Sequence, residues 1–210
     1  MSGQMRQDAS QAGGPEAAIV AALGTRSVVL VGMMGAGKSS IGRRLSARLA
    51  IPFADADTEI ETAAGMSIPD IFATYGEAHF RSGETRVIAR LLEGGPQVLA
   101  TGGGAFMNAD TRASISAHGV SIWLKADLEV LMRRIKRRQD RPLLHADDPG
   151  EILRALIDER YPVYAQAHIT IQSRDVPHEK IVDEIVTALA LHLVPGAAVA
   201  DTMPTAEQAS

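Results

Sequence analysis

The sequence predicts a three-layer α/β fold in which helices flank a five-stranded parallel sheet. Short apolar runs alternate with longer amphipathic segments, which is the pattern of a layered α/β protein. The run 28–31 is apolar throughout, as expected of a parallel strand buried on both faces. Glycines or aspartates lie within two residues of the ends of the first three runs, and ligands of parallel sheets bind at the carboxyl ends of the strands. We therefore expect one binding crevice at that end of the sheet.

The elements follow from the periodicity of apolar residues and from capping signals. Strands are expected over residues 28–31, 51–54, 97–100, 121–124 and 168–171. Helices are expected over residues 38–49, 58–63, 67–75, 77–92, 127–135, 151–164 and 176–193, with another beginning after Asn108. Ser67 and Pro69 form an N-cap with proline in the first turn, and Gly65 and Gly76 interrupt the helical pattern.

Length and composition favour one ordinary globular domain. The 210 residues are expected to comprise an extension over 1–26 that is disordered or helical, a domain over 27–193 and a disordered tail over 194–210. The absence of cysteine excludes disulfides, thiolate metal sites and cysteine nucleophiles, and it is compatible with a cytoplasmic protein. A net charge of −4 argues against general nucleic-acid binding, and no apolar run is long enough to span a membrane.

Residues 32–39 match the phosphate-binding loop pattern G-x-x-x-x-G-K-[ST] between a strand and a helix. Glycines let the backbone N–H groups turn toward a phosphate, and the helix N-terminus adds partial positive charge. Lys38 would contact the terminal phosphates and Ser39 would ligate Mg²⁺. The expected nucleotide-binding residues here are Gly35, Ala36, Gly37, Lys38, Ser39 and Ser40. The segment predicts binding of a nucleoside triphosphate.

Two aspartates follow the second expected strand. Asp55 and Asp57 are two positions apart, so both carboxylates can point into the crevice from an extended backbone. One could hold the metal shell and the other could orient an acceptor hydroxyl. The alternative is that one of them only caps the following helix.

Glycines and arginines supply candidate groups for a second substrate. Gly102, Gly103 and Gly104 would let a ligand approach the backbone closely, although a flexible turn would have the same sequence. Arg81 lies three positions before Glu84 on one helical face, and Arg160 lies near the end of another helix. A guanidinium suits bidentate capture of a carboxylate or phosphate, yet a lone arginine is more often a solvated surface residue.

A basic segment lies over residues 133–141, with six lysines and arginines in nine positions. In an acidic chain it suggests a mobile lid, over about 137–149, that closes on polyphosphate and delivers charge as an arginine finger does. Nucleic-acid binding and a solvated helix face are the competing interpretations.

Taken in order, these motifs resemble the shikimate kinase family over about 28–193. The matching positions are the segment 32–39 with Ile41-Gly42-Arg43, Asp55-x-Asp57, Phe80-Arg81-x-x-Glu84, Gly102–Gly104, Arg141-Pro142-Leu143-Leu144 and Arg160-x-x-x-Tyr164. The phosphate-binding loop alone is common to many kinases, whereas the whole set is much more specific. Ser40 stands where threonine is commoner, and the two terminal extensions are not explained by the family.

The resemblance implies a P-loop kinase fold and transfer of the ATP γ-phosphoryl group to the 3-hydroxyl of shikimate, with Mg²⁺, in a monomer. It implies catalytic roles for Lys38, Asp57 and Arg141. It implies nucleotide contacts from Arg134 near adenine and from Arg141, and a metal shell that includes Ser39 and Asp55. It implies a shikimate site built from Asp57, Arg81, Gly102, Gly103, Gly104 and Arg160.

Other functions remain open at the level of the residues. Gluconate kinase or another small-metabolite kinase is the main alternative, and a nucleoside monophosphate kinase fits less well. A binding module that has lost catalysis is disfavoured by the presence of Lys38, Ser39, Asp57 and Arg141.

Overall fold

A computed structural model describes residues 14–136 and 148–195, and its five strands form one parallel sheet. The strands are β1 (Ser27–Val31), β2 (Phe53–Asp55), β3 (Val98–Ala100), β4 (Gly119–Lys125) and β5 (Ile169–Gln172). Their spatial order is β2-β3-β1-β4-β5. Val28 pairs with Val98 on one side and with Val120 on the other, so β1 lies at the centre of the sheet. The five-stranded parallel sheet is confirmed.

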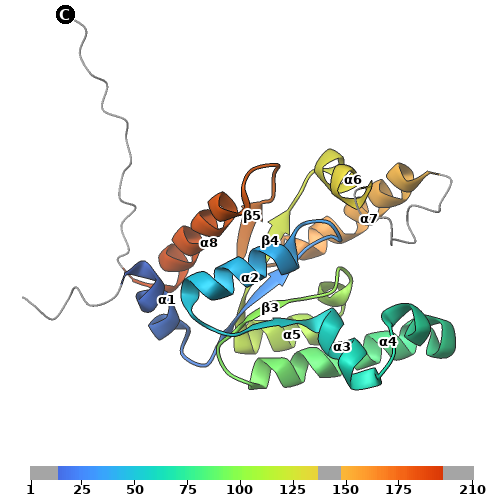
Figure 1. Cartoon of the computed structure of the whole chain (residues 1–210), viewed down its shortest axis with the longest axis horizontal. Helices are drawn as coiled ribbons and strands as arrows, with labels where there is room; N and C mark the ends of the chain where they lie inside the picture. Colours follow the sequence, from blue (N-terminus) through green and yellow to red (C-terminus); the bar gives the residue numbers. More distant parts are fainter. Residues whose placement is uncertain (1–13, 137–147, 196–210) are drawn as a thin grey trace, which may run out of the picture.

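Helices cover both faces of this sheet. They are α1 (Pro15–Leu23), α2 (Lys38–Leu49), α3 (Ala56–Ala64), α4 (Ile68–Glu93), α5 (Ala109–His118), α6 (Leu128–Lys136), α7 (Pro149–Tyr164) and α8 (His178–Leu193), with a 3₁₀ turn η1 (Ala105–Met107). One layer contains α1, α2 and α8, which pack on one another, and α4 and α5 pack together on the opposite side (Figure 1). Within the described residues, no helix is long and apolar enough to cross a membrane.

The packing separates a main core from a smaller cluster near the edge strand β2. Every residue of β1 is buried, as the unbroken apolar run predicts. Ile60, Ile71 and Phe80 form a separate buried cluster between α3 and α4. These two helices therefore hold a unit of their own beside the sheet (Figure 1), and this unit carries both Asp57 and Arg81.

Several boundaries differ from those expected. The interruption expected at Gly76 is confirmed, because α4 consists of two helical segments that meet at Gly76, whose φ of 79° and ψ of 172° are not helical. Strand β2 begins at Phe53 rather than at residue 51, because Pro52 has no N–H to donate to the ladder. Strand β5 is displaced by one residue, and α8 begins after Pro177 rather than at residue 176.

The lid expected over about 137–149 stays a prediction, and only its last two residues are described. Asp148 caps α7 through its carboxylate, which accepts from the N–H groups of Gly150 and Glu151, and Pro149 is the first residue of that helix. The last two residues of the expected lid thus belong to the start of α7. Residues 137–147 lie outside the described part of the chain.

The extension before β1 contains a helix that joins the core. Ile19 and Leu23 of α1 are buried, and α1 packs on α8 and α2. Arg48 of α2 donates to Glu16 of α1 at 2.5 Å. The described part of the extension, from residue 14, therefore takes the helical form rather than the disordered one.

Replacing Ile19 with alanine should destabilise the fold. The side chain is 0% exposed, so its removal should lower the free energy of unfolding by about 2–5 kcal/mol. Denaturant unfolding monitored by circular dichroism measures this. Ala18→Ser, at an exposed position of the same helix, is the control. An Ile19→Ala variant as stable as that control would show that α1 adds nothing to the core.

Candidate active site

The phosphate-binding loop lies between β1 and α2, as its motif predicts. Gly35 and Gly37 have φ angles of 83° and 95°, conformations that an L side chain rarely adopts. The ammonium of Lys38 donates to the carbonyls of Gly32 at 2.8 Å and Met33 at 3.0 Å. Helix α2 begins at Lys38, directly after the loop, so the N–H groups at its N-terminus lie next to the loop. This arrangement suits an anion-binding site.

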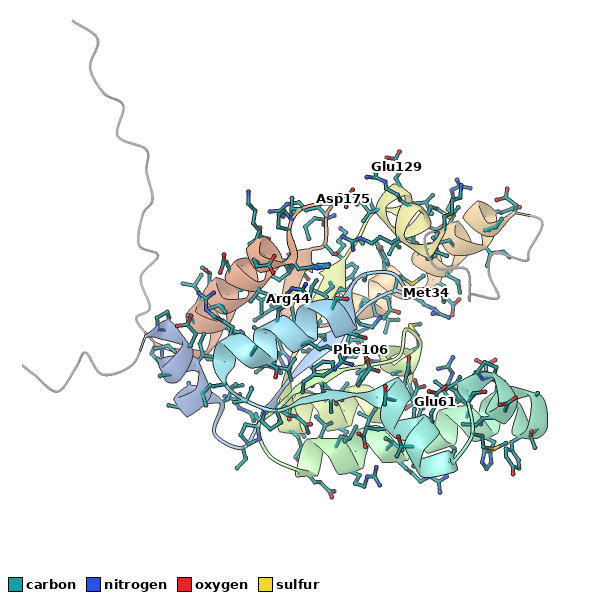
Figure 2. The ribbon with its side chains drawn as sticks, viewed as in Figure 1. Met34, Arg44, Glu61, Phe106, Glu129 and Asp175 are labelled. Atoms are coloured by element: carbon teal, nitrogen blue, oxygen red, sulfur yellow. The ribbon has the colours of Figure 1, made fainter. Side chains whose placement is uncertain are left out.

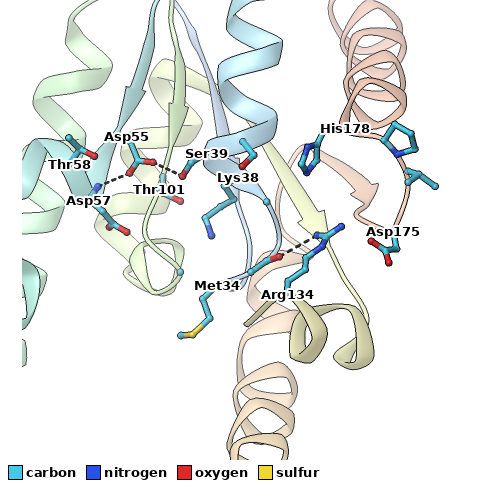
Figure 3. A pocket seen from close by; sticks show the side chains of 16 residues that line it. Met34, Lys38, Ser39, Asp55, Asp57, Thr58, Thr101, Arg134, Asp175 and His178 are labelled. Atoms are coloured by element: carbon cyan, nitrogen blue, oxygen red, sulfur yellow. Dashed lines mark hydrogen bonds between the residues drawn. The ribbon is translucent and has the colours of Figure 1, made fainter. Parts of the chain in front are cut away.

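Asp55 connects this loop to the neighbouring strand. The Ser39 hydroxyl donates to Asp55 Oδ2 at 2.5 Å, and Asp55 Oδ1 accepts the N–H of Asp57 at 3.2 Å (Figure 3). The carboxylate is therefore both the N-cap of α3 and the partner of the expected metal ligand. The sequence presented helix capping and metal binding as alternative roles for these aspartates, but the position of Asp55 is compatible with both roles.

Asp57 stands in the first turn of α3 in a half-buried position. Burial raises the pKa of its carboxyl above the usual value, and the negative charge of Asp55 adds to this effect. Lys38 and Arg81 oppose the rise in pKa, so Asp57 lies within the field of both cationic groups. A carboxylate with a raised pKa is a better proton acceptor than an ordinary aspartate.

Arg81 and Arg160 come from different helices and approach the same loop. Arg81 donates to Glu84 at 2.7 Å and contacts Glu77 at 3.3 Å, both within α4. Arg160 of α7 donates to the carbonyl of Gly103 at 3.4 Å. The structure thus places both guanidinium groups at the glycine loop rather than at unrelated surface positions.

Two buried polar atoms near this loop have no hydrogen-bond partner among the described residues. They are Glu84 Oε1 and Arg160 Nε. Burial raises the pKa of Glu84, while Arg81 opposes that rise. Buried polar groups in native proteins are nearly always paired, so unpaired ones point to a ligand or water that supplies the missing bonds.

The absence of side chains at the glycine triplet allows this convergence. A Cβ on Gly102 would lie 2.6 Å from Glu84 Oε1 and 2.8 Å from Asp57 Oδ1. A Cβ on Gly104 would lie 2.7 Å from both terminal nitrogens of Arg81. Contacts this short would force the side chains of Asp57, Glu84 or Arg81 to shift, so the missing Cβ atoms of Gly102 and Gly104 let these side chains lie close to the loop.

The nucleotide side of the site is a pocket of about 710 Å³. Its wall is formed by the phosphate-binding loop, the two aspartates and the segment after β5, with lining residues that include Met34, Gly35, Gly37, Lys38, Ser39, Ser40, Asp55, Asp57, Thr101, Gly103, Arg134 and 175–178. Figure 3 shows Lys38 between Asp57 and Arg134, with Asp175 and His178 across the pocket. Met34 and Asp175 lie at the same end of the sheet (Figure 2). The pocket is large enough for a nucleotide.

Comparison with known proteins identifies the family. The family model described as shikimate kinase matches residues 34–190. The chain belongs to the shikimate kinase family. It is 66% identical over 179 residues to a shikimate kinase of Bradyrhizobium diazoefficiens, covering 85% of this chain and 86% of that protein. It is also 66% identical over 174 residues to one of Rhodopseudomonas palustris, covering 83% of this chain and 86% of the relative.

Solved structures agree with this assignment. A shikimate kinase from Acinetobacter baumannii in complex with shikimate superimposes with a TM-score of 0.77 at 36% identity, covering 81% of this chain and 96% of that one. A gluconokinase from Sinorhizobium meliloti gives a TM-score of 0.54 at 19% identity, covering 80% of this chain and 94% of that one, which shows a shared fold. The P-loop kinase fold expected from the sequence is confirmed.

Some residues of this shikimate kinase family member were missed in the sequence. The turn 175–178 lines the pocket although it was assigned no role, because its residue types carry no known signal. It follows the carboxyl end of β5, so the rule applied to the first three strands would have found it. Glu84 was quoted in a motif but given no function, and its spacing from Arg81 was the available signal.

Of the two arginines expected to bind the nucleotide, Arg134 lies in the described part of the chain and Arg141 does not. Arg134 lines the pocket and donates to the carbonyl of Gly35 at 3.3 Å and to that of Arg174 at 2.7 Å. Its expected contact with adenine stays a prediction. Arg141 lies outside the described residues, so its role as the catalytic arginine also stays a prediction.

Proposed function

We propose that this chain transfers the γ-phosphoryl group of ATP to the 3-hydroxyl of shikimate, giving shikimate 3-phosphate and ADP. The observation that supports it most directly is the convergence of Asp57, Arg81 and Arg160 on one glycine loop beside the phosphate-binding loop that carries Lys38. Relatives that are 66% identical bear the name shikimate kinase, and the related structure from A. baumannii holds shikimate. The reaction belongs to the biosynthesis of aromatic amino acids.

The nucleotide occupies the pocket between the phosphate-binding loop and the turn 175–178. Amides of Gly35, Ala36 and Gly37 face its phosphates, with Lys38 and Arg141 stabilising charge on the transferred group. The remaining proposed nucleotide contacts come from Ser39, Ser40 and Arg134. Ser40 and Arg134 line the pocket, which supports their assignment.

The proposal includes Mg²⁺ held by Ser39, with Asp55 in or near its coordination shell. The hydroxyl and carboxylate are 2.5 Å apart, and oxygen donors of this kind suit a hard cation. The described residues hold no group of three or more His, Cys, Asp or Glu side chains arranged for a metal. This fits Mg²⁺, which usually takes one or two protein oxygens together with substrate phosphates. When bound, the ion would neutralise phosphate charge.

Shikimate lies on the glycine loop. Arg81 and Arg160 hold its carboxylate, while the backbone of Gly102, Gly103 and Gly104 faces its ring. Asp57 accepts a hydrogen bond from the acceptor hydroxyl, which orients the oxygen for attack on phosphorus and takes its proton during transfer. The raised pKa of Asp57 supports this role.

The remaining assignments concern the setting of the reaction. We propose a monomeric cytoplasmic enzyme without nucleic-acid or membrane partners, because ATP is supplied in the cytoplasm and both substrate sites are formed within one chain. The net charge of −4 supports the absence of a nucleic-acid partner.

A coupled assay for ADP release tests the function. With ATP and Mg²⁺, shikimate should support turnover, while gluconate and AMP should not. Turnover with gluconate and none with shikimate would establish the alternative kinase. ADP binding without turnover on any of the three acceptors would instead identify a binding module.

Substitution of Gly102 by alanine should separate the two substrate sites. The added methyl group would collide with Asp57 and Glu84, and displacement of groups by 1 Å can reduce turnover by about a hundred-fold. We expect kcat/KM for shikimate to fall by about that factor while ADP affinity, measured by calorimetry, changes little. Gly83→Ala is a matched control, since a Cβ there has nothing within 4 Å. Equal activity of the two variants would contradict the packed acceptor site.

A further inference from the structure

The carbonyl of Ala36, within the phosphate-binding loop, is held by two side chains from distant parts of the chain. Ser173 Oγ donates to it at 2.8 Å, and Arg134 Nη1 approaches it at 3.3 Å. Arg134 Nη1 also donates to Ser173 Oγ at 2.9 Å, so the hydroxyl donates one hydrogen bond and accepts another. Ser173 is 0% exposed and is not among the described residues that line the pocket.

Ser173 is itself fixed by the sheet. It directly follows β5, and its N–H donates to the carbonyl of Lys125 at the end of β4 at 2.6 Å. Strand β4 separates β5 from β1, the strand that precedes the phosphate-binding loop. The loop is therefore anchored to a rigid point two strands away, in addition to its own ends on β1 and α2.

The anchored carbonyl determines where the next amide points. In a trans peptide the C=O of one residue and the N–H of the following residue point in opposite directions, and no cis bond occurs in the described residues. Holding the Ala36 carbonyl toward Ser173 thus directs the Gly37 N–H to the other side, where Gly37 lines the pocket. Gly35 and Gly37 both have positive φ, and glycine restricts backbone rotation least. Hydrogen bonds from outside the loop therefore help to fix a backbone conformation that the glycines themselves leave free.

The opposite wall of the pocket begins two residues after Ser173. Residues 175–178, which follow Ser173 closely, line the pocket across from Lys38 (Figure 3). A shift of Ser173 would therefore move both the phosphate-facing loop and the wall beyond it. Among the described residues, Ser173 forms hydrogen bonds with Ala36, Arg134 and Lys125, and none of these belongs to the proposed shikimate site.

We propose that Ser173 is a positioning residue for the triphosphate, acting through the Ala36 carbonyl to aim the Gly37 amide. This inference rests on the proposed function, because it requires ATP in the pocket. Loss of the hydroxyl frees the peptide to rotate and leaves Arg134 as the one side chain, among the described residues, that still holds this carbonyl. The expected consequence is weaker nucleotide binding with an unaltered acceptor site.

Steady-state kinetics of Ser173→Ala tests this. Loss of one buried hydrogen bond predicts about a five-fold rise in the KM for ATP and in the Kd for ADP, with the KM for shikimate unchanged. Ser27→Ala is the matched control: Ser27 is also 0% exposed, and its hydroxyl donates to the carbonyl of Gly95 at 3.0 Å, at the other end of the sheet. Both variants should lose comparable thermal stability, but only Ser173→Ala should lose nucleotide affinity.

Three outcomes are distinguishable. An unchanged KM for ATP in Ser173→Ala, with a loss of stability like that of Ser27→Ala, would overturn the positioning role. Ser173→Thr keeps the hydroxyl, so its nucleotide affinity should stay near that of the unmodified chain; a loss equal to that of the alanine variant would assign the effect to volume and overturn the proposal too. Absence of shikimate-dependent ADP release from the unmodified chain would instead refute the proposed function.

Discussion

Replacement of Lys38 by methionine is expected to lower kcat by about a thousand-fold, which is the loss typical when a donor to developing transition-state charge is removed. Methionine retains most of the apolar stem, so the change chiefly removes the ammonium. The Lys38 ammonium is the group that contacts the transferred phosphoryl oxygens in the proposed reaction. Steady-state assays of ADP release at saturating shikimate and ATP measure the change in kcat.

Lys180→Met is the control for the Lys38 substitution. Lys180 is an exposed lysine on α8 that does not line the pocket, and its replacement should leave kcat unchanged. A second measurement is needed because the Lys38 ammonium also holds the carbonyls of Gly32 and Met33. Thermal unfolding would show whether the loop still folds. Substantial turnover in a folded Lys38→Met variant would remove the lysine from the mechanism.

Asp57→Asn should reduce kcat by about 10²–10⁴-fold, the usual contribution of a positioned proton acceptor. The amide keeps the size of the carboxylate but cannot take the proton of the acceptor hydroxyl. We expect a smaller change in the KM for shikimate, because Arg81 and Arg160 remain. Glu59→Gln, which alters another carboxylate of α3, should have little effect. Near-normal turnover in Asp57→Asn would show that the carboxylate is not a proton acceptor.

The pH dependence gives an independent test of Asp57. Burial, with the charge of Asp55, raises the pKa of this carboxyl, so kcat/KM should begin to fall at a higher pH than an ordinary aspartate would give. The active form is the carboxylate, so activity is present above this pKa and is lost as pH falls through it. The acidic limb of the profile should disappear in Asp57→Asn. An identical limb in both proteins would assign it to another group.

The sequence predicted the parallel sheet and the phosphate-binding loop well because each depends on local rules. The unbroken apolar run of β1 and the glycines before Lys38 have few alternative interpretations. The ends of elements were less well predicted. Strand β2 begins at Phe53, where its pairing with Val98 of the distant strand β3 starts and after Pro52, which has no N–H to donate. Helix α8 begins after Pro177.

Contacts between distant segments could not be predicted from the residues. The collision that would follow a Cβ on Gly102 involves Asp57 from α3 and Glu84 from α4, and only the packed fold brings them together. Ser173 looks like an ordinary residue after a strand, although it reaches Ala36 across 137 positions. The family resemblance supplied the acceptor arginines, whereas composition alone would have left them on the surface.

The hydrogen bonds of Lys38 to its own loop have a consequence for the heat of nucleotide binding. The ammonium is already largely dehydrated, with the residue 9% exposed, because two backbone carbonyls stand in for its water. An arriving phosphate therefore exchanges one set of acceptors for another and strips little water from the lysine. Calorimetry of nucleotide binding should accordingly show that Lys38→Met lowers the favourable binding enthalpy. The binding entropy should change little, because the lysine releases little ordered water when the phosphate binds.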